Sequence, residues 1–264
     1  MPGKAILFDA TKCTACRGCQ VACKQWNDLK GVETTNRGTY ENPANLSVET
    51  WMKIRFIEET NNGSVAWLFA RQACMHCTDA GCINACPTQA LYRHTLGFVA
   101  YDKNLCSGCG YCAEFCPYDI PHLDTNQITG FGKMDKCTFC QDRVTNGLDP
   151  ACVATCPTGA LQFGDRGELL MQGWSRARTL QGQGHPDATL YGENQLGGLH
   201  VLYILDRGAS TYGLPVDPQL PLAQTALRDI MRPVGYGLVG AVTVGLGVNY
   251  LVARARMVRE KEDR

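Results

Sequence analysis

The pattern of apolar and polar residues divides the chain into short strands, one amphipathic helix and one long uncharged segment near the C-terminus. Short strands are predicted at residues 6–9, 51–57, 65–70, 90–92, 97–102, 160–163 and 200–205. Asn61-Asn62-Gly63, between the second and third of these, is typical of a β-hairpin turn. Residues 168–180 have helical periodicity with a polar face, and the proline-bearing residues 212–222 predict an extended linker.

The uncharged segment, residues 233–253, is long enough to cross a membrane. A helix of this length rises about 30 Å, which is the thickness of a hydrocarbon core. Arg232 and Arg254 bracket it, and Tyr236 and Tyr250 occupy the places of interfacial anchors. A buried helix of a soluble protein is the alternative, because the many glycines weaken the hydrophobicity of the segment.

Small residues and flanking charges indicate how this segment would sit in a membrane. Gly237, Ala241 and Gly245 recur at every fourth position, which favours close packing on another membrane helix. The positive-inside bias places the C-terminus in the cytoplasm and the rest of the chain on the periplasmic side, because basic residues gather after the segment. They are Arg254, Arg256, Arg259, Lys261 and Arg264. Residues 1–10 lack a signal-peptide h-region, so export would depend on a partner that carries the signal.

Composition narrows the class of protein. The 264 residues include 25 basic and 25 acidic side chains, and a net charge of zero argues against a nucleic-acid-binding protein. An apolar content of 45% excludes wholesale disorder. The unusual feature is the presence of 16 cysteines, which must form disulfides or bind metal or clusters.

The cysteines fall into four groups of four. The groups are Cys13, Cys16, Cys19 and Cys23; Cys74, Cys77, Cys82 and Cys86; Cys106, Cys109, Cys112 and Cys116; and Cys137, Cys140, Cys152 and Cys156. Every group opens with Cys-x2-Cys and closes with Cys-x3-Cys, and only the middle gap varies. Proline follows the closing cysteine in groups two, three and four, whereas Lys24 takes this place in group one.

This spacing is that of bacterial ferredoxins, which bind [4Fe–4S] clusters. Two-residue gaps let one tight loop wrap three thiolates around one cubane, and the fourth cysteine, on a short helix, points toward a second cubane. Each group therefore supplies three ligands to one cluster and one to its partner. The sixteen cysteines predict four [4Fe–4S] clusters with no ligand left over.

Disulfides and structural zinc are the other interpretations of so many thiols. Neighbouring Cys-x2-Cys thiols are poorly placed to join distant segments, which argues against a disulfide framework. Zinc ribbons use two separated Cys-x2-Cys pairs, so the third cysteine and the closing x3-Cys-Pro would have no role in them. We therefore favour clusters over zinc.

Spacing alone leaves three ways of pairing the groups. The short stretch from Cys86 to Cys106 favours groups two and three as one compact module, which leaves group one with group four. This pairing predicts cluster A at Cys13, Cys16, Cys19 and Cys156; cluster B at Cys74, Cys77, Cys82 and Cys116; cluster C at Cys106, Cys109, Cys112 and Cys86; and cluster D at Cys137, Cys140, Cys152 and Cys23.

The predicted fold is of the α+β class, with tandem bacterial-ferredoxin-like modules and one C-terminal transmembrane helix. Residues 1–164 form the cluster domain, in which 73–130 make the inner module, and 1–72 with 131–164 make the outer module with its hairpin insertion. Residues 165–232 are an extension and linker, 233–253 the transmembrane helix and 254–264 a cytoplasmic tail.

The sequence around group one resembles a known family. Cys23-Lys24-Gln25-Trp26-Asn27, together with residues 51–54, 136–156 and 197–201, resembles the iron–sulfur (beta) subunits of respiratory membrane-bound formate dehydrogenases over essentially the whole chain. The cysteine pattern alone is shared with the equivalent subunits of membrane hydrogenases and of sulfoxide, polysulfide and nitrate reductases, which remain the alternative.

The resemblance implies a complex that supplies the catalytic residues, while this chain has none of its own. A catalytic alpha subunit with a molybdenum or tungsten pterin would oxidise formate, and a membrane cytochrome b gamma subunit would reduce quinone. The resemblance supports the pairing above, and it implies that cluster A lies nearest the alpha subunit and cluster D nearest the membrane.

Basic residues near the cysteines are expected to offset the negative charge of the clusters and raise their potentials. The candidates are Arg17, Lys24, Lys103, Lys133, Lys136 and Arg143, for which a plain solvated role is the alternative. His200 is expected to be structural, because no cluster lacks a ligand.

Overall fold

The computed structural model describes residues 3–61, 63–124, 132–221 and 231–262. It divides into two compact units, Met1–Gln219 and Leu220–Arg264. The fold mixes helices and strands, as the sequence predicts. Parts of several predicted features lie outside the described residues: Asn62 of the hairpin turn, residues 125–130 of the inner module and 131 of the outer module, residues 222–230 of the linker, and residues 263–264 of the tail.

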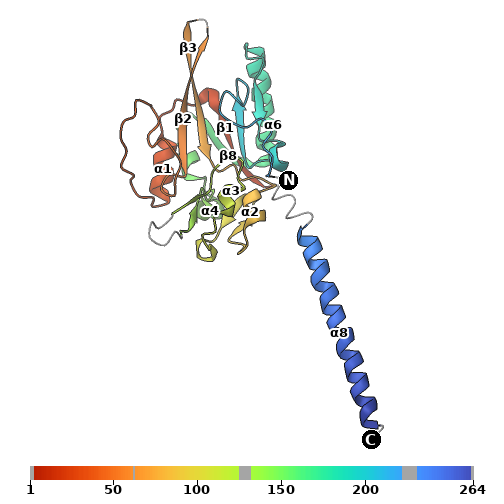
Figure 1. Ribbon diagram of the computed structural model, residues 1–264. Helices are drawn as coiled ribbons and strands as arrows, with labels where there is room; N and C mark the ends of the chain where they lie inside the picture. The colour runs from red at the N-terminus through yellow and green to blue at the C-terminus, as the bar shows by residue number, and fades with distance from the viewer. Residues whose placement is uncertain (1–2, 62, 125–131, 222–230, 263–264) are drawn as a thin grey trace. The chain divides into compact units, whose positions relative to one another are not determined.

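A four-stranded sheet in the order β8-β1-β10-β9 organises the first unit (Figure 1). Its strands are β8 (Leu161–Asp165), β1 (Lys4–Asp9), β10 (Val201–Leu205) and β9 (Thr189–Tyr191). β1 runs antiparallel to β8 and parallel to β10, so the chain beyond residue 165 completes a sheet that begins near the N-terminus. The sequence predicted β1, β8 and β10 as strands but not this parallel pairing, which brings together residues almost 200 positions apart.

The two faces of the sheet pack against different parts of the chain. Successive side chains of β1 point to opposite faces, as in any β-strand. Ala5 and Leu7 pack with helix α6 (Arg166–Gly182), whose predicted polar face leaves one apolar stripe for the sheet. Ile6 and Phe8 point to the opposite face, into the core that also contains most of the cysteines. The sheet therefore serves as one wall of the cysteine-containing core.

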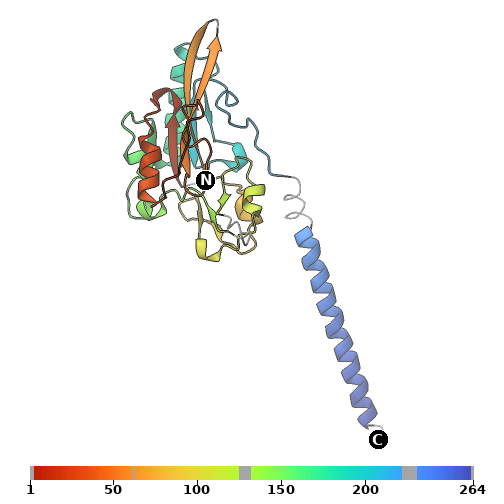
Figure 2. The same ribbon diagram turned by 60° about the vertical axis from the view of Figure 1, so that its left-hand side comes forward.

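Three further β-hairpins link the cysteine groups in succession. They pair β2 (Met52–Asn61) with β3 (Ser64–Ala73), β4 (Leu91–Arg93) with β5 (Val99–Tyr101), and β6 (His122–Leu123) with β7 (Met134–Asp135). In each hairpin the strand that follows one cysteine group pairs with the strand that leads into the next. The β8–β1 pair completes this series by joining the strand after group four to the strand before group one. The long β2–β3 hairpin confirms the one predicted around Asn61, and helix α1 (Gly18–Trp26) contacts β2 (Figure 2).

The internal repeat predicted from the sequence is present at the level of strand register. Leu91 pairs with Tyr101, and Leu161 pairs with Phe8 at the equivalent place. The amides of Asp102 and Asp9 likewise donate to the carbonyls of Ala90 and Ala160, each at 2.8 Å. The strand pair between groups two and three is thus repeated between groups four and one.

Short helices and 3-10 turns lie between and beside the cysteine loops. The helices are α2 (Gly81–Ala85), α3 (Tyr111–Glu114), α4 (Gln141–Thr145) and α5 (Ala151–Ala154), with 3-10 turns η1 (Ala10–Lys12), η2 (Lys103–Leu105) and η3 (Gln195–Gly197). Of these helices, α2, α3 and α5 carry Cys82, Cys112 and Cys152. The second unit is dominated by helix α8 (Arg232–Glu262). It contains the predicted uncharged segment and continues nine residues beyond Ala253.

Candidate iron–sulfur site

The four Cys-x2-Cys loops share one backbone conformation. The residue before the second cysteine has a positive φ in every loop: Ala15 at 53°, His76 at 50°, Gly108 at 75° and Phe139 at 62°. A left-handed residue costs about 1–2 kcal/mol for any side chain except glycine, so its recurrence points to a local requirement. Loops of this kind turn successive amides inward and form concave sites for anions, including iron–sulfur clusters.

Cavity A is lined by Cys13, Cys16 and Cys19 of group one together with Cys156 of group four. Cys19 lies on α1, whereas Cys156 follows α5, and the two helices pack against each other. Burial, then the neighbouring Cys152 thiol, raises the pKa of Cys19 to about 12. The residues predicted for cluster A are therefore all found around one cavity.

Cavity D lies beside cavity A and is lined by Cys137, Cys140 and Cys152 with Cys23 of group one. All four of these cysteines are buried. Cys23 is one helical turn after Cys19 on α1, so this helix contributes one thiol to each cavity. Asn27, at the C-terminal end of α1, directs its side-chain amide toward the Cys23 sulfur at 3.8 Å.

Cavity B is lined by Cys74, Cys77 and Cys82 with Cys116 of group three. Burial raises the pKa of Cys116 to about 11, and the Cys74 thiol adds to this rise. Residues 196–200 cover this loop: Leu199 bridges to Cys77, and the amide of Thr78 donates to the carbonyl of Gly198 at 2.8 Å. Leu196 lines cavity B, and the family-like stretch at 197–201 that follows it packs on the Cys77 loop.

The thiols predicted for cluster C also come together. Burial raises the pKa of Cys112 to about 12, with further contributions from the Cys106, Cys109 and Cys86 thiols. The amide of Met134 donates to the Cys106 sulfur at 3.4 Å. Cys109 is exposed, so this set lies closest to the surface of its module.

The donor set fits iron–sulfur clusters better than the alternatives. All sixteen cysteines are free of disulfides. Among the described residues, no three His, Cys, Asp or Glu side chains converge closely enough to hold a single metal ion. The thiols instead surround cavities, as a cubane with a metal at several corners requires. Iron would displace protons from thiols such as Cys19, Cys112 and Cys116, because burial raises their pKa values.

Aromatic rings connect cavity D to cavity B. His76, between Cys74 and Cys77, meets Phe139, between Cys137 and Cys140, edge to face at 4.8 Å between ring centroids. Phe98 stacks on Phe139 at 4.9 Å. This contact joins the loop of group two to the loop of group four, so it connects cavity B to cavity D.

Two buried cations flank this junction. Lys136 is 1% exposed, lines cavity B, and donates to the carbonyls of Val99 at 2.8 Å and Cys137 at 3.0 Å. Arg71 is 2% exposed and lines cavity D. The sequence predicted that Lys136 offsets cluster charge, but it did not predict a role for Arg71. The only sign of Arg71 in the sequence is the presence of a charged residue in the apolar run before Cys74.

The other predicted basic residues are less closely associated with the thiols. Arg17 lines cavity A and lies over the Phe56 ring at 4.8 Å. Lys24 donates to backbone carbonyls, including that of Glu49 at 2.6 Å, Lys103 pairs with Asp135, and Arg143 covers the Trp26 ring. These contacts indicate mainly structural roles for the last three.

His200 is structural, as expected from the sequence. It is buried, and its Nδ1 hydrogen-bonds to the carbonyl of Lys4 at 2.7 Å, with burial lowering its pKa to about 4.

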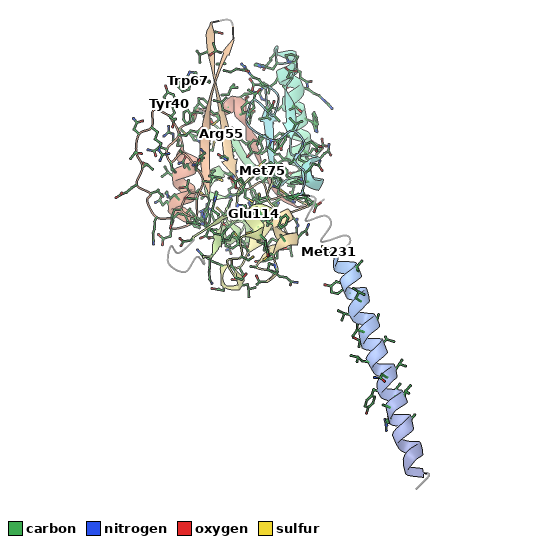
Figure 3. The ribbon with its side chains drawn as sticks, viewed as in Figure 1. Tyr40, Arg55, Trp67, Met75, Glu114 and Met231 are labelled. Carbon is green, nitrogen blue, oxygen red and sulfur yellow. The ribbon has the colours of Figure 1, made fainter. Side chains whose placement is uncertain are left out.

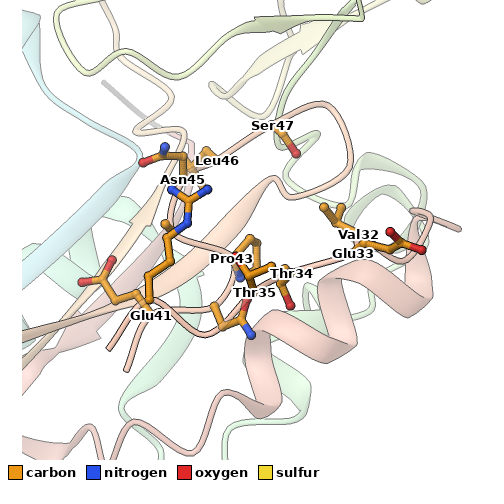
Figure 4. Close-up of a pocket in the computed structure, with 12 residues that line it drawn as sticks. Val32, Glu33, Thr34, Thr35, Glu41, Pro43, Asn45, Leu46 and Ser47 are labelled. Carbon is orange, nitrogen blue, oxygen red and sulfur yellow. The ribbon is translucent and has the colours of Figure 1, made fainter. Parts of the chain in front are cut away.

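Away from the cysteines, the surface has two distinct features. An open pocket is lined by residues of the 32–47 loop, among them Glu41 and Leu46 (Figure 4). Tyr40 and Trp67, labelled in Figure 3, are partly exposed and contact each other edge to face at 4.8 Å. Neither feature includes a cysteine, so neither belongs to the cluster site.

In the second unit, residues Val234–Ala255 of α8 form a stretch of 22 residues that is long and apolar enough to cross a membrane. Its described side chains are exposed, including Tyr236 and Tyr250. A helix of this composition is consistent with a membrane anchor.

The repeated hairpins, the left-handed loops and the thiol-lined cavities define the class of protein: a ferredoxin-like iron–sulfur protein for electron transfer. A family model for the 4Fe-4S dicluster domain matches residues 65–166.

Curated proteins give a more specific result. The formate dehydrogenase iron–sulfur subunit of Haemophilus influenzae is 37% identical over 98% of this chain and 83% of its own length. The nitrate-inducible formate dehydrogenase iron–sulfur subunit of Escherichia coli is 38% identical over 94% of this chain and 84% of its own length.

The chain belongs to the family of formate dehydrogenase iron–sulfur subunits. A thiosulfate reductase electron transfer subunit of Salmonella typhi is 39% identical, but it covers only 64% of this chain. The formate dehydrogenase subunits match the residues beyond the dicluster domain as well, which confirms the family indicated by the sequence around group one.

Proposed function

We propose that this chain is the electron-transfer subunit of a membrane-bound formate dehydrogenase and holds four [4Fe–4S] clusters. Clusters A, B, C and D would be bound by the cysteine sets given above, through which electrons pass one at a time. The observation that carries the proposal is the grouping of sixteen thiols into four sets, in a chain related to formate dehydrogenase subunits along its whole length.

The contacts between cavities favour a linear order, A–D–B–C. Helix α1 carries one cysteine for A and one for D, Cys152 on α5 belongs to D while Cys156 just after it belongs to A, and His76 with Phe139 links D to B. Exposed cysteines occur only at the two ends of this order, Cys16 in A and Cys109 in C, among thiols that are otherwise buried or half-buried. We therefore place electron entry and exit at A and C, and cluster D in the interior, rather than nearest the membrane as the family resemblance implied.

The partners follow from the same proposal. A catalytic alpha subunit with a molybdenum or tungsten pterin would deliver electrons from formate to cluster A. A membrane cytochrome b gamma subunit would accept them from cluster C and pass them to quinone. Helix α8 would anchor the chain in the lipid beside that subunit, with the cluster domain on the periplasmic side and the C-terminus in the cytoplasm.

The deciding experiment is anaerobic purification of the intact complex from membranes, followed by iron analysis and reduction assays. We expect about sixteen iron per chain and reduction of the clusters by formate. Reduction by hydrogen but not formate would favour a hydrogenase subunit, and a colourless preparation with about four zinc per chain would exclude electron transfer altogether. Protease accessibility of a C-terminal tag in spheroplasts tests the orientation.

A further inference from the structure

Arg71 occupies an unusual position for a charged side chain. It lies on β3, three residues before Cys74, and is among the largest fully buried side chains of the described chain. It lines cavity D together with Cys23, Cys137 and Cys152. An arginine placed this deeply needs either a counter-ion or a full set of hydrogen-bond acceptors.

The hydrogen-bonding capacity of Arg71 is largely unused. Its Nε and Nη1 atoms are buried and have no hydrogen-bond partner. The phenol of Tyr203 contacts the guanidinium, and it also donates to the Arg71 carbonyl at 3.0 Å. Among the described residues, Arg71 forms no ion pair with a carboxylate. Lys136, by contrast, donates to two backbone carbonyls.

Arg71 belongs to the surroundings of one thiol set. It lines cavity D but neither cavity A nor cavity B. A positive charge held at this cavity acts most strongly on a cluster bound there, because the Coulomb energy falls with distance. Arg71 is therefore placed to act on cluster D.

A cluster in cavity D would supply this counter-ion. A cubane bound by four cysteines carries a net charge of roughly −2 when oxidised and gains one more negative charge when reduced. Sulfur atoms that face cavity D can accept hydrogen bonds from the unpartnered guanidinium nitrogens, and hydrogen bonds to sulfur raise the reduction potential. The same cation would be costly to bury beside an empty cavity.

We propose that Arg71 is a positioning residue that sets the reduction potential of cluster D. It would do so as the buried counter-ion and hydrogen-bond donor of this cluster. In the proposed order A–D–B–C, clusters A and B are the neighbours of cluster D and respond less to this charge, and cluster C is the most distant. Arg71 thereby keeps cluster D reducible in the interior, where burial alone would make the reduced form unfavourable. The inference rests on the proposed cluster assignment.

The test is an EPR-monitored redox titration of the intact complex carrying Arg71→Gln, with Arg71→Lys and the exposed Arg178→Gln as matched variants. The signal of cluster D is identified as the one altered by Cys140→Ser. We expect Arg71→Gln to lower the ratio of reduced to oxidised cluster D at a fixed potential at least tenfold, which is 59 mV for a one-electron couple. We expect Arg71→Lys to keep most of the reduction potential of cluster D. The potential of cluster C should be unchanged in Arg71→Gln, and the potentials of all clusters should be unchanged in Arg178→Gln.

Iron content separates the two proposals. A fully loaded Arg71→Gln complex whose clusters titrate as in the wild type would overturn the role of Arg71 and leave the electron-transfer function standing. A wild-type complex without iron and sulfide would overturn the function itself. If Arg71→Gln does not assemble, the role of Arg71 is tested instead by EPR of wild-type complex labelled with 15N-arginine. A 15N hyperfine coupling at reduced cluster D supports the proposal, because Arg71 is the arginine that lines this cavity, and its absence contradicts it.

Discussion

The imidazole of His76 meets the phenyl ring of Phe139 edge to face, with 4.8 Å between ring centroids. Each ring belongs to a Cys-x2-Cys loop and is held there by a left-handed backbone. The strained loops of groups two and four are thus held against each other by this ring contact. Edge-to-face aromatic pairs of this kind contribute about 0.5–1.5 kcal/mol beyond their buried area.

Removing the Phe139 ring should weaken this junction. Phe139 is 1% exposed and packs on Phe98 as well as on His76. We expect Phe139→Ala to destabilise the protein by about 3–5 kcal/mol, because it leaves a cavity between His76 and Phe98. Denaturant unfolding of the cluster-loaded protein under anaerobic conditions measures this loss. Phe139→Leu, which refills much of the space, should cost less, and an equal cost for both would contradict a packing role.

Cys152 and Cys156 belong to the same cysteine group but to different cavities, so substitutions at the two positions should affect different clusters. Cys156 belongs to group four by sequence, yet it lines cavity A with Cys13, Cys16 and Cys19. We therefore expect Cys156→Ser to alter the EPR signal of cluster A and leave that of cluster D intact. Cys152→Ser, four residues earlier, should do the opposite. If both substitutions affected the same signal, the pairing of groups one and four would be wrong.

Gly108 and Gly110 form a matched pair around Cys109. Both have a positive φ, at 75° and 80°. A Cβ at Gly108 would lie 2.2 Å from the carbonyl oxygen of Gly132, whereas a Cβ at Gly110 meets open space. We expect Gly110→Ala to cost about 1–2 kcal/mol through its backbone alone. Gly108→Ala should in addition displace the loop and reduce iron content, most strongly at cluster C. Equal iron content in the two variants would contradict this expectation and would mean that Gly132 can move away from the added methyl group without loss of the cluster.

The sequence predicted the parts of this fold that depend on local spacing. The four cysteine groups, the hairpin around Asn61 and helix α6 follow from patterns within about twenty residues. The parallel pairing of β1 with β10 could not be predicted, because it depends on which distant strand completes the wall of the core. Arg71 was missed for a related reason: its burial comes from the packing of β3 against Tyr203 and the loops of group four, and none of these is near it in sequence.

The burial of His200 predicts a pH dependence of stability. The folded chain protonates this imidazole only near pH 4, because burial lowers its pKa, whereas an unfolded chain binds the proton near pH 6.5. Acidification from pH 6.5 toward pH 4 therefore favours the unfolded state and removes stability that is fully present above pH 6.5. Between pH 7.5 and 5.5 the loss due to this group amounts to about 1 kcal/mol.

The matching variant is His200→Asn, whose side-chain amide can keep the hydrogen bond to Lys4 but does not titrate. We expect it to be less stable than wild type at pH 7.5 and to lose less stability on acidification. Thermal unfolding of both proteins at the two pH values, under anaerobic conditions, measures the difference. Parallel pH profiles would show that His200 does not titrate on unfolding.

Helix α8 gives a prediction about membrane attachment that is independent of the clusters. Val242 lies near the middle of the apolar stretch Val234–Ala255, and Val234 lies at its start. Arginine at the centre of a membrane helix costs about 2.5–3.5 kcal/mol on insertion scales, whereas arginine at the end can reach the lipid headgroups. We expect Val242→Arg to release the chain from carbonate-washed membranes and Val234→Arg to leave it bound. Iron content should be the same in both, because the cysteines belong to the other compact unit. Retention of Val242→Arg in the membrane would indicate that partner subunits, rather than α8, hold the protein there.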